Sequence, residues 1–252
     1  MARPAAALGP GDRSAVCQGG TAGAPLGDMP CTAPTGHLVL ARHGQTSWSR
    51  AGRHTGRTDL PLEPEGEDQA RRLGQLLSGL RFTAVLVSPL QRARATCELA
   101  GLAGGARVVP DLAEWDYGAY EGRTTPDIRA ERPGWDIWTQ PPPGGETVEE
   151  VGARAERVIA QAVAAGGEVL IVSHAHLLRV LTARWLGLAA AEGRRFVLAT
   201  AAVAVLGYER ETPALLRWNV TGGALLDPAG GSGSTDPRRP PQEPGPPSPG
   251  FP

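Results

Sequence analysis

The segment His37-Leu-Val-Leu-Ala-Arg-His-Gly44 decides the fold class of this chain of 252 residues. Its first part, residues 37–42, is a short apolar run of the kind that forms a strand buried on both faces of a sheet. Further strand patterns lie at 84–88, 169–173, 202–207 and 215–218. Helical patterns lie between them, at about 65–79, 90–102, 147–165 and 176–187.

Alternation of strands and helices predicts an α/β fold, a three-layer α/β/α sandwich with a mostly parallel sheet. The last two strand patterns, 202–207 and 215–218, predict a closing pair. Thr147 and Glu150 have the spacing of a capping box and predict the start of one helix. In such sheets ligands bind beyond the carboxyl ends of the strands.

The folded domain is expected to span residues 37–227. Residues 1–36 contain 20 Gly, Ala or Pro and no periodic apolar pattern, and they predict a disordered N-terminal extension. Residues 228–252 contain 9 Pro and 5 Gly and predict a disordered tail. The apolar run at 5–8 is too short for the core of a signal peptide, which favours a cytoplasmic protein.

Composition excludes several classes of function. A net charge of −1 gives no reason to expect a basic surface that binds nucleic acid or a membrane. No stretch approaches the roughly 18 consecutive apolar residues that a membrane span needs. All 25 basic residues are arginine, so chemistry that needs a Schiff-base or phosphate-loop lysine is excluded. Three scattered cysteines fit neither a disulfide framework nor a zinc site. We expect no metal and no cofactor.

Polar residues suited to an anion follow three of the predicted strands. Arg42 and His43 end the first, Ser88 and Arg92 follow the second, and Ser173-His174-Ala175-His176 follows the third. An arginine fork matches phosphate oxygens, and a neutral imidazole can act as a nucleophile near neutral pH. Glu114, in a loop rich in aromatic residues, is a candidate general acid. This combination predicts phosphoryl transfer through a phosphohistidine.

Five motifs in this order resemble the histidine phosphatase (phosphoglycerate mutase-like) superfamily over nearly all of 37–227. They are Arg42-His43-Gly44 with the loop through Gly66, Ser88-Pro-Leu-Gln-Arg92, Glu114-Trp-Asp-Tyr-Gly-Ala-Tyr-Glu-Gly122, Gly144-Gly-Glu-Thr147, and Ser173-His174. The loop containing Trp48-Ser49 and the motif from Glu114 resemble the phosphatase branch of sedoheptulose-bisphosphatase-type enzymes and unassigned bacterial phosphatases.

The resemblance implies a phosphoglycerate mutase-like fold and a role for each matching residue. It implies that His43 accepts the phosphoryl group, that Arg42, Arg92 and His174 hold its oxygens, and that Glu114 is the proton donor. Many members have Asn where Ser49 stands, and a shorter serine reaches less far. The residues expected to bind substrate are Ser49, Thr55, Gly56, Arg57, Thr58, Trp115 and Tyr117.

The expected function is a metal-independent phosphatase acting on a small phosphorylated metabolite such as a sugar phosphate, as a possible homodimer. A phosphoglycerate mutase is one alternative, but Trp115 stands where the family's mutases have arginine. A phosphoprotein or phosphohistidine phosphatase is another, although the aromatic segment 114–140 suggests a cap over a small substrate. A non-catalytic phosphate-binding protein is the third, and both His43 and Glu114 argue against it.

The motifs and the segment 114–140 contain further residues for which we expect other places. His54 is expected at the surface, and His176 behind the residues that contact substrate. Glu121 is the alternative acid to Glu114. Glu146 either caps a helix or supports the pocket. The aromatic residues of 114–140 either wall the substrate cleft or pack a lid onto the core; they are Trp115, Tyr117, Tyr120, Trp135 and Trp138.

Overall fold

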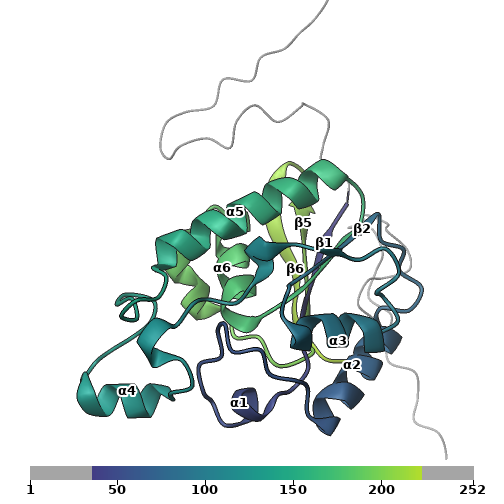
Figure 1. The fold of residues 1–252 in the computed structure, drawn as a ribbon. Coiled ribbons are helices and arrows are strands. Elements are labelled where there is room, and N and C mark those ends of the chain that lie inside the picture. Colours follow the sequence, from purple (N-terminus) through teal and green to yellow (C-terminus); the bar gives the residue numbers. More distant parts are fainter. Residues whose placement is uncertain (1–35, 223–252) are drawn as a thin grey trace, which may run out of the picture. The chain divides into compact units, whose positions relative to one another are not determined.

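The computed structural model of the chain describes residues 36–222, drawn in colour in Figure 1. The predicted tail at 228–252, the predicted extension up to residue 35, and the last residues of the predicted domain lie outside this range. No described helix combines the length and the apolarity that a bilayer crossing requires.

Six strands and six α-helices make up the described part of the chain. The strands are β1 (Leu38–Arg42), β2 (Ala84–Val87), β3 (Arg107–Val108), β4 (Val169–Ser173), β5 (Val203–Glu209) and β6 (Thr212–Val220). The helices are α1 (Ser47–Arg50), α2 (Pro64–Leu76), α3 (Gln91–Leu99), α4 (Thr125–Glu131), α5 (Val148–Ala165) and α6 (Ala175–Trp185). Short 3-10 helices lie at Pro110–Leu112, Gly118–Tyr120 and Ala190–Arg195.

The strands form one sheet in the order β3-β2-β4-β1-β5-β6. The four strands from β3 to β1 are parallel. β5 pairs antiparallel with β1, and β6 pairs antiparallel with β5, so that β5 and β6 form the predicted closing pair. The prediction of a mostly parallel sheet is therefore confirmed.

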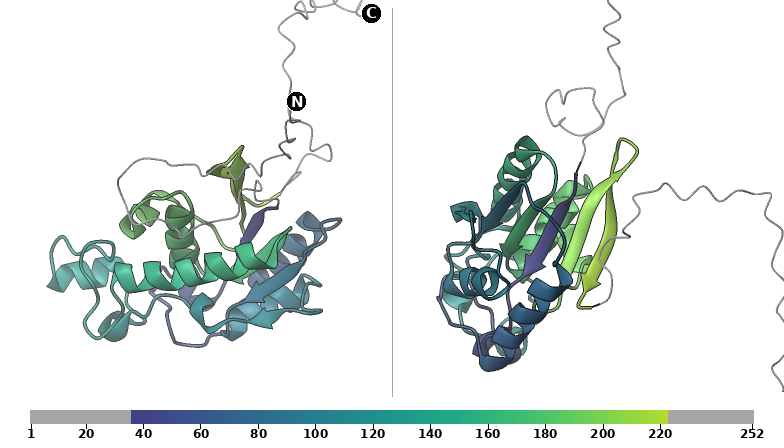
Figure 2. Two further views of the ribbon diagram at one scale, coloured as in Figure 1. Left: turned by 90° about the horizontal axis from the view of Figure 1, so that it is seen from above. Right: turned by 90° about the vertical axis from the view of Figure 1, so that its right-hand side faces the viewer.

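Helices cover both faces of this sheet (Figures 1 and 2). Leu38 and Leu40 of β1 belong to a core cluster with side chains of α5 and α6, whereas Val39 and Ala41 belong to a second cluster with side chains of α2 and α3. Successive side chains of a strand point to opposite faces, so a strand buried on both must be apolar throughout. This explains the unbroken apolar run of β1 and confirms the three-layer α/β/α sandwich.

Local signals fix the helix ends. The Thr147 hydroxyl accepts a hydrogen bond from the Glu150 backbone N–H, and the Glu150 carboxylate accepts one from the Thr147 backbone N–H, so the predicted capping box is confirmed. Thr124 and Asp127 form the same box at the start of α4, which the sequence analysis missed.

Three neighbouring strands of the sheet end side by side. Arg42 of β1 pairs with Ser173 of β4, and Val87 of β2 pairs with Val172 of β4. The residues that follow these strands, among them His43, Ser88 and His174, therefore meet at one edge of the sheet.

Candidate active site

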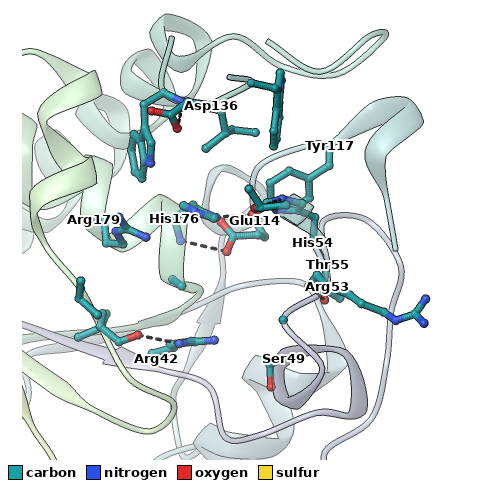
Figure 3. Close-up of a pocket in the computed structure, with 18 of the residues that line it drawn as sticks. Arg42, Ser49, Arg53, His54, Thr55, Glu114, Tyr117, Asp136, His176 and Arg179 are labelled. Atoms are coloured by element: carbon teal, nitrogen blue, oxygen red, sulfur yellow. Dashed lines mark hydrogen bonds between the residues drawn. The ribbon is translucent and has the colours of Figure 1, made fainter. Parts of the chain in front are cut away.

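A cavity of about 440 Å³ opens at this edge of the sheet (Figure 3). It is lined from the end of β1, the first loop after it, the start of α6, and the aromatic segment that contains α4. Four arginines line it, namely Arg42, Arg53, Arg129 and Arg179. Its carboxylates are Glu114 and Asp136, and its rings are His43, His54, Tyr117, Trp135, Trp138 and His176.

His43 lies in this lining with its side chain almost wholly buried. Its Nδ1 lies 2.6 Å from the Gly44 carbonyl oxygen. Since a carbonyl only accepts, Nδ1 carries the proton and Nε2 keeps its lone pair. Burial, and then the charges of Arg42 and Arg92, lower the pKa of His43 well below its usual value. The imidazole is therefore neutral and nucleophilic even in mildly acidic solution.

Gly44 is required by the path of the loop after His43. A Cβ at this position would lie 2.2 Å from the Gly66 carbonyl oxygen, at the start of α2. Such a contact is far inside the normal separation of nonbonded atoms, so any larger residue would push His43 away from α2. Close approach of the loop to α2 therefore fixes the backbone on which the His43 ring is mounted.

Arg42 presents a positive charge to the cavity next to His43. Its Nη1 donates to the Leu198 carbonyl oxygen at 2.6 Å, but its Nε is buried and has no hydrogen-bond partner. Burial lowers the pKa of Arg42, yet a guanidinium stays charged in proteins. An unsatisfied buried donor on a cation is costly, and an anion that binds beside the Arg42 guanidinium would offset this cost.

Glu114 lies in the cavity lining, 6 % exposed. Its Oε2 accepts a hydrogen bond from the His176 backbone N–H at 3.1 Å, drawn in Figure 3, and its Oε1 accepts from the Leu177 backbone N–H at 2.9 Å. Both donors belong to the first turn of α6, where backbone N–H groups lack partners within the helix. The N-terminus of α6 therefore orients the carboxyl group of Glu114.

Arg92 and His174 lie beneath the cavity rather than in its lining, and both are fully buried. Arg92 Nε donates to His174 Nδ1 at 3.2 Å, so the proton of His174 is on Nε2, which donates to the Ser88 hydroxyl at 2.7 Å. The His174 ring centroid lies 5.1 Å from that of His43. Contact of His174 Nε2 with a phosphate, as the resemblance implies, requires this bond to Ser88 to open.

Arg92 also holds the first loop in place. Its Nη2 donates to the carbonyl oxygens of Thr55 and Gly56, and its Nη1 donates to that of Thr58. Glu121, the alternative acid, accepts hydrogen bonds from the backbone N–H groups of Gly56 and Thr58. Glu121 thus supports this loop, and the cavity lining contains Glu114 and not Glu121.

Four of the residues expected to bind substrate lie outside the lining of the main cavity. Trp115 is fully buried and donates from Nε1 to the Glu146 carbonyl oxygen. Gly56 and Arg57 line a second cavity of about 270 Å³, and Thr58 lines neither cavity. The spacing of a motif indicates proximity to the site, but it does not distinguish side chains that face the substrate from those that pack behind it.

The other three predicted substrate-binding residues do line the main cavity. Thr55 and Tyr117 face it directly. Ser49 lines it too, but its hydroxyl accepts from the Thr46 backbone N–H and donates to the Thr46 carbonyl oxygen as part of the cap of α1.

His54 and His176 occupy more central places than the sequence predicted. His54 was expected at the surface, but it is buried and lines the cavity, where its ring lies 4.7 Å from that of Tyr117. His176 also lines the cavity, and its Nδ1 lies 2.5 Å from the Tyr117 hydroxyl. Burial raises the pKa of Tyr117 well above its usual value, so its hydroxyl keeps its proton.

Burial of His54 predicts a dependence of stability on pH. Desolvation lowers the pKa of His54 from 6.5 to about 4. Between these values the unfolded chain binds a proton at His54 and the folded chain does not. The contribution of neutral His54 to the unfolding free energy is therefore fully present above pH 6.5 and is lost as the pH falls toward 4. The pKa shift corresponds to a contribution of about 3 kcal/mol.

The variant His54→Gln should therefore lose about 3 kcal/mol less of its unfolding free energy than the original chain between neutral pH and about pH 4. Urea unfolding at the two pH values measures this difference. Equal losses in the two proteins would show that His54 is not buried as a neutral ring.

Arg179 is a cavity residue that the sequence analysis missed. Its Nε and Nη2 donate to the carbonyl oxygens of Gly193 and Arg194, and its guanidinium carbon lies 4.6 Å from the centroid of the Trp138 ring. Figure 3 shows Arg179, Arg42 and Glu114 facing the same space. The position of Arg179, five residues after His174 and about one helical turn into α6, was the available signal.

Segment 114–140 contains five aromatic residues with two kinds of place. Tyr117, Trp135 and Trp138 line the cavity, while Trp115 and Tyr120 pack in the core. Both predicted uses of these residues, as cavity wall and as packing, are therefore present. Within residues 36–222, the structure brings together no group of three or more His, Cys, Asp or Glu side chains that could hold a metal ion.

Comparisons with known proteins agree with this geometry. An acid phosphatase of Mycobacterium tuberculosis is 44% identical over 189 residues, which cover 73% of this chain and 93% of the relative. A sedoheptulose 1,7-bisphosphatase of Saccharomyces cerevisiae is 37% identical over 193 residues, covering 64% of this chain and 70% of the relative. A solved structure from M. tuberculosis, 43% identical, superposes with a TM-score of 0.71 and covers 75% of this chain and 99% of its own.

The model of one protein family matches residues 38–221, which are nearly all of the described range and include every motif from Arg42 to His174. The chain therefore belongs to the histidine phosphatase superfamily (branch 1), a superfamily of phosphomonoesterases.

Proposed function

We propose that this protein hydrolyses a phosphomonoester of a small metabolite, a phosphorylated sugar or a similar compound, through a phosphohistidine formed on His43. One observation carries the proposal: a neutral His43 with its lone pair on Nε2 lies in the same cavity as Arg42, whose buried Nε has no partner. Nucleophile and anion-binding group are adjacent in the chain and line one space.

In the first step, the lone pair of His43 Nε2 attacks phosphorus and the bond between phosphorus and the ester oxygen breaks. Glu114 gives a proton to the leaving oxygen, which departs as an alcohol. Arg42 stabilises the charge on the phosphoryl oxygens, with Arg92 and His174 behind it. In the second step, water attacks phosphorus while Glu114 takes a proton from the water. The phosphorus–nitrogen bond breaks, its electron pair returns to His43 Nε2, and inorganic phosphate leaves.

The cavity supports a small substrate. Its volume of about 440 Å³ lies in the range of small-molecule sites, and the segment from Glu114 to Trp138 walls it. Arg53, Arg129 and Arg179 line it in addition to Arg42, so it offers more positive charge than one phosphate needs. We therefore propose a substrate with a second anionic group, and the sugar bisphosphate in the name of the yeast relative is an example of this chemistry.

A panel of phosphorylated metabolites tests this assignment. Sugar bisphosphates and phosphorylated carboxylic acids should give higher kcat/KM than sugar monophosphates. Loss of a hydrogen bond to a charged group costs about 1.5–3 kcal/mol, so Arg179→Gln should lower kcat/KM for the doubly anionic substrates by about tenfold to a hundredfold. Hydrolysis of para-nitrophenyl phosphate should change by less than about threefold, because only its single phosphate needs to bind.

The control for Arg179→Gln is Arg184→Gln. Arg184 lies on the same helix, pairs with Glu156 and is absent from the cavity lining. If Arg179→Gln lowered the activity toward all substrates equally, a second anion site at Arg179 would be excluded.

A further inference from the structure

The segment that carries Glu114 is tied to α5 by one arginine. Arg154 of α5 donates from Nη1 to the carbonyl oxygens of Asp111 and Ala113, at 2.7 and 2.9 Å, and from Nη2 to the Glu114 carbonyl oxygen at 3.4 Å. Three carbonyl groups within four residues thus converge on one guanidinium. Each lies on the main chain that sets the direction of the Glu114 side chain.

Glu146 completes this connection from the other side of Glu114. Its carboxylate receives Arg154 Nε at 2.7 Å and Nη2 at 2.8 Å, and the two side chains are only 13% and 19% exposed. Its Oε2 also accepts from the Asp116 backbone N–H at 2.9 Å. The paired side chains therefore hold the main chain both before and after Glu114.

All five N–H groups of Arg154 are used in these bonds, two of them on carboxylate oxygens in the fork geometry that favours arginine. Removing either partner would leave a nearly buried charge without its counterion. Because every N–H group of Arg154 is hydrogen-bonded, the guanidinium fixes the positions of the groups around it. Neither lysine nor a neutral side chain can make the same set of bonds.

Packing does not hold Glu114 on this side. The second cavity, of about 270 Å³, is lined by Ala113, Glu114, Glu146 and Arg154 among others. The segment therefore has space to shift on this side, and the hydrogen bonds of Arg154 and Glu146 oppose such a shift. A displacement of about 1 Å in a catalytic group can cost about a hundredfold in rate.

We infer that Arg154, together with Glu146, is a positioning residue that sets the Glu114 carboxyl group for proton transfer to the leaving oxygen. The inference rests on the proposed function, because it assumes that Glu114 is the acid. If the inference is correct, loss of the Arg154 side chain impairs proton donation by Glu114. The phosphate-binding and nucleophilic groups, which Arg154 does not contact, are unaffected.

Leaving groups separate proton donation from the other steps. Para-nitrophenolate departs without a proton, whereas the alkoxide of an alkyl phosphate needs one. Arg154→Met should therefore lower kcat for an alkyl phosphate such as glycerol phosphate by about tenfold to a hundredfold, with KM nearly unchanged. Its rate of phosphohistidine formation from para-nitrophenyl phosphate, measured in a single turnover, should stay within about threefold of the original value.

The matched control is Arg157→Met. Arg157 lies three residues further along α5 and also holds this segment, but it does so through the side chain of Asp111 and is 55% exposed. Both substrates should be hydrolysed by Arg157→Met within about threefold of the original rate, as expected for an exposed ion pair.

Combination with Glu114→Gln distinguishes positioning from a general loss of structure. If Arg154 acts through Glu114, then Arg154→Met should cause little further loss in the Glu114→Gln background, because interacting residues are not additive. Additive losses, or equal losses with aryl and alkyl phosphates, would overturn the inference, as would no loss with either ester.

Should Arg154→Met fail to fold, as judged by circular dichroism, Glu146→Gln decides the question. It keeps one oxygen that can accept from the Asp116 backbone N–H and removes the charge and the oxygen that accepts from Arg154 Nε. The same difference between alkyl and aryl esters must appear. Retained activity in His43→Ala would instead refute the proposed function, whatever the Arg154 variants do.

Discussion

Replacement of His43 by alanine is expected to reduce the hydrolysis of para-nitrophenyl phosphate by at least about 10⁴-fold, since the group that attacks phosphorus is lost. The remaining cavity can still bind phosphate through Arg42, and each of the other imidazoles at the site has at least one ring nitrogen in a hydrogen bond. The His174 ring has both nitrogens engaged by Arg92 and Ser88, His176 has its Nδ1 engaged by Tyr117, and His54 has its Nε2 engaged by Thr125. Measurement of kcat for the purified variant tests this expectation.

The control is His37→Ala, one residue before the start of the same strand. His37 pairs with Glu168 at the opposite end of β1 and lines neither the main nor the second cavity. Its variant should keep the original kcat, and both variants should give the circular dichroism spectrum of an α/β protein. Turnover by His43→Ala at more than a small fraction of the original rate would exclude His43 as the nucleophile.

Replacement of Glu114 by glutamine is expected to reduce the hydrolysis of alkyl phosphates by about 10²- to 10⁴-fold, the usual contribution of a general acid. Glutamine has nearly the same shape and an oxygen that can accept from the first turn of α6, but it cannot supply the proton. Formation of the phosphohistidine from para-nitrophenyl phosphate should be much less affected, because its leaving group needs no proton. Single-turnover kinetics with the two esters measures the difference.

Asp136 provides the decisive comparison, because it is the other carboxylate in the cavity lining. Figure 3 shows it away from Arg42, with Glu114 between the two. If Asp136→Asn showed the selective loss with alkyl esters and Glu114→Gln did not, the acid would be Asp136 and the account of α6 as its orienting element would be wrong.

Much of the fold could be predicted because its signals are local. The apolar run of β1 is buried on both faces, and the capping box at Thr147 fixes the start of α5 within the helix itself. The two-residue β3 and the four-residue α1 are too short to show a period. The seven-residue α4 was missed although Thr124 and Asp127 carried a capping signal as clear as the one at Thr147.

At the site, the sequence predicted which strand ends meet but not which side chains face the cavity. His54 lies in the lining because loops and helices from distant parts of the chain fold over it, and no spacing in the sequence records that. For Arg179, the position one turn into α6 after His174 was a signal that could have been used. Trp115 follows Glu114 directly, yet its ring packs into the core and its Nε1 donates to Glu146. Neighbouring residues of a loop commonly point in different directions, so a motif alone cannot assign contacts.

Detection of a phosphoryl group on His43 tests the central claim most directly. The protein is mixed rapidly with para-nitrophenyl phosphate, quenched at alkaline pH, where phosphohistidine survives, digested, and analysed by mass spectrometry. The account predicts an adduct of one phosphoryl group on the peptide that contains His43, and none in His43→Ala. Continued turnover by a protein whose His43 peptide never carries this adduct would contradict the account.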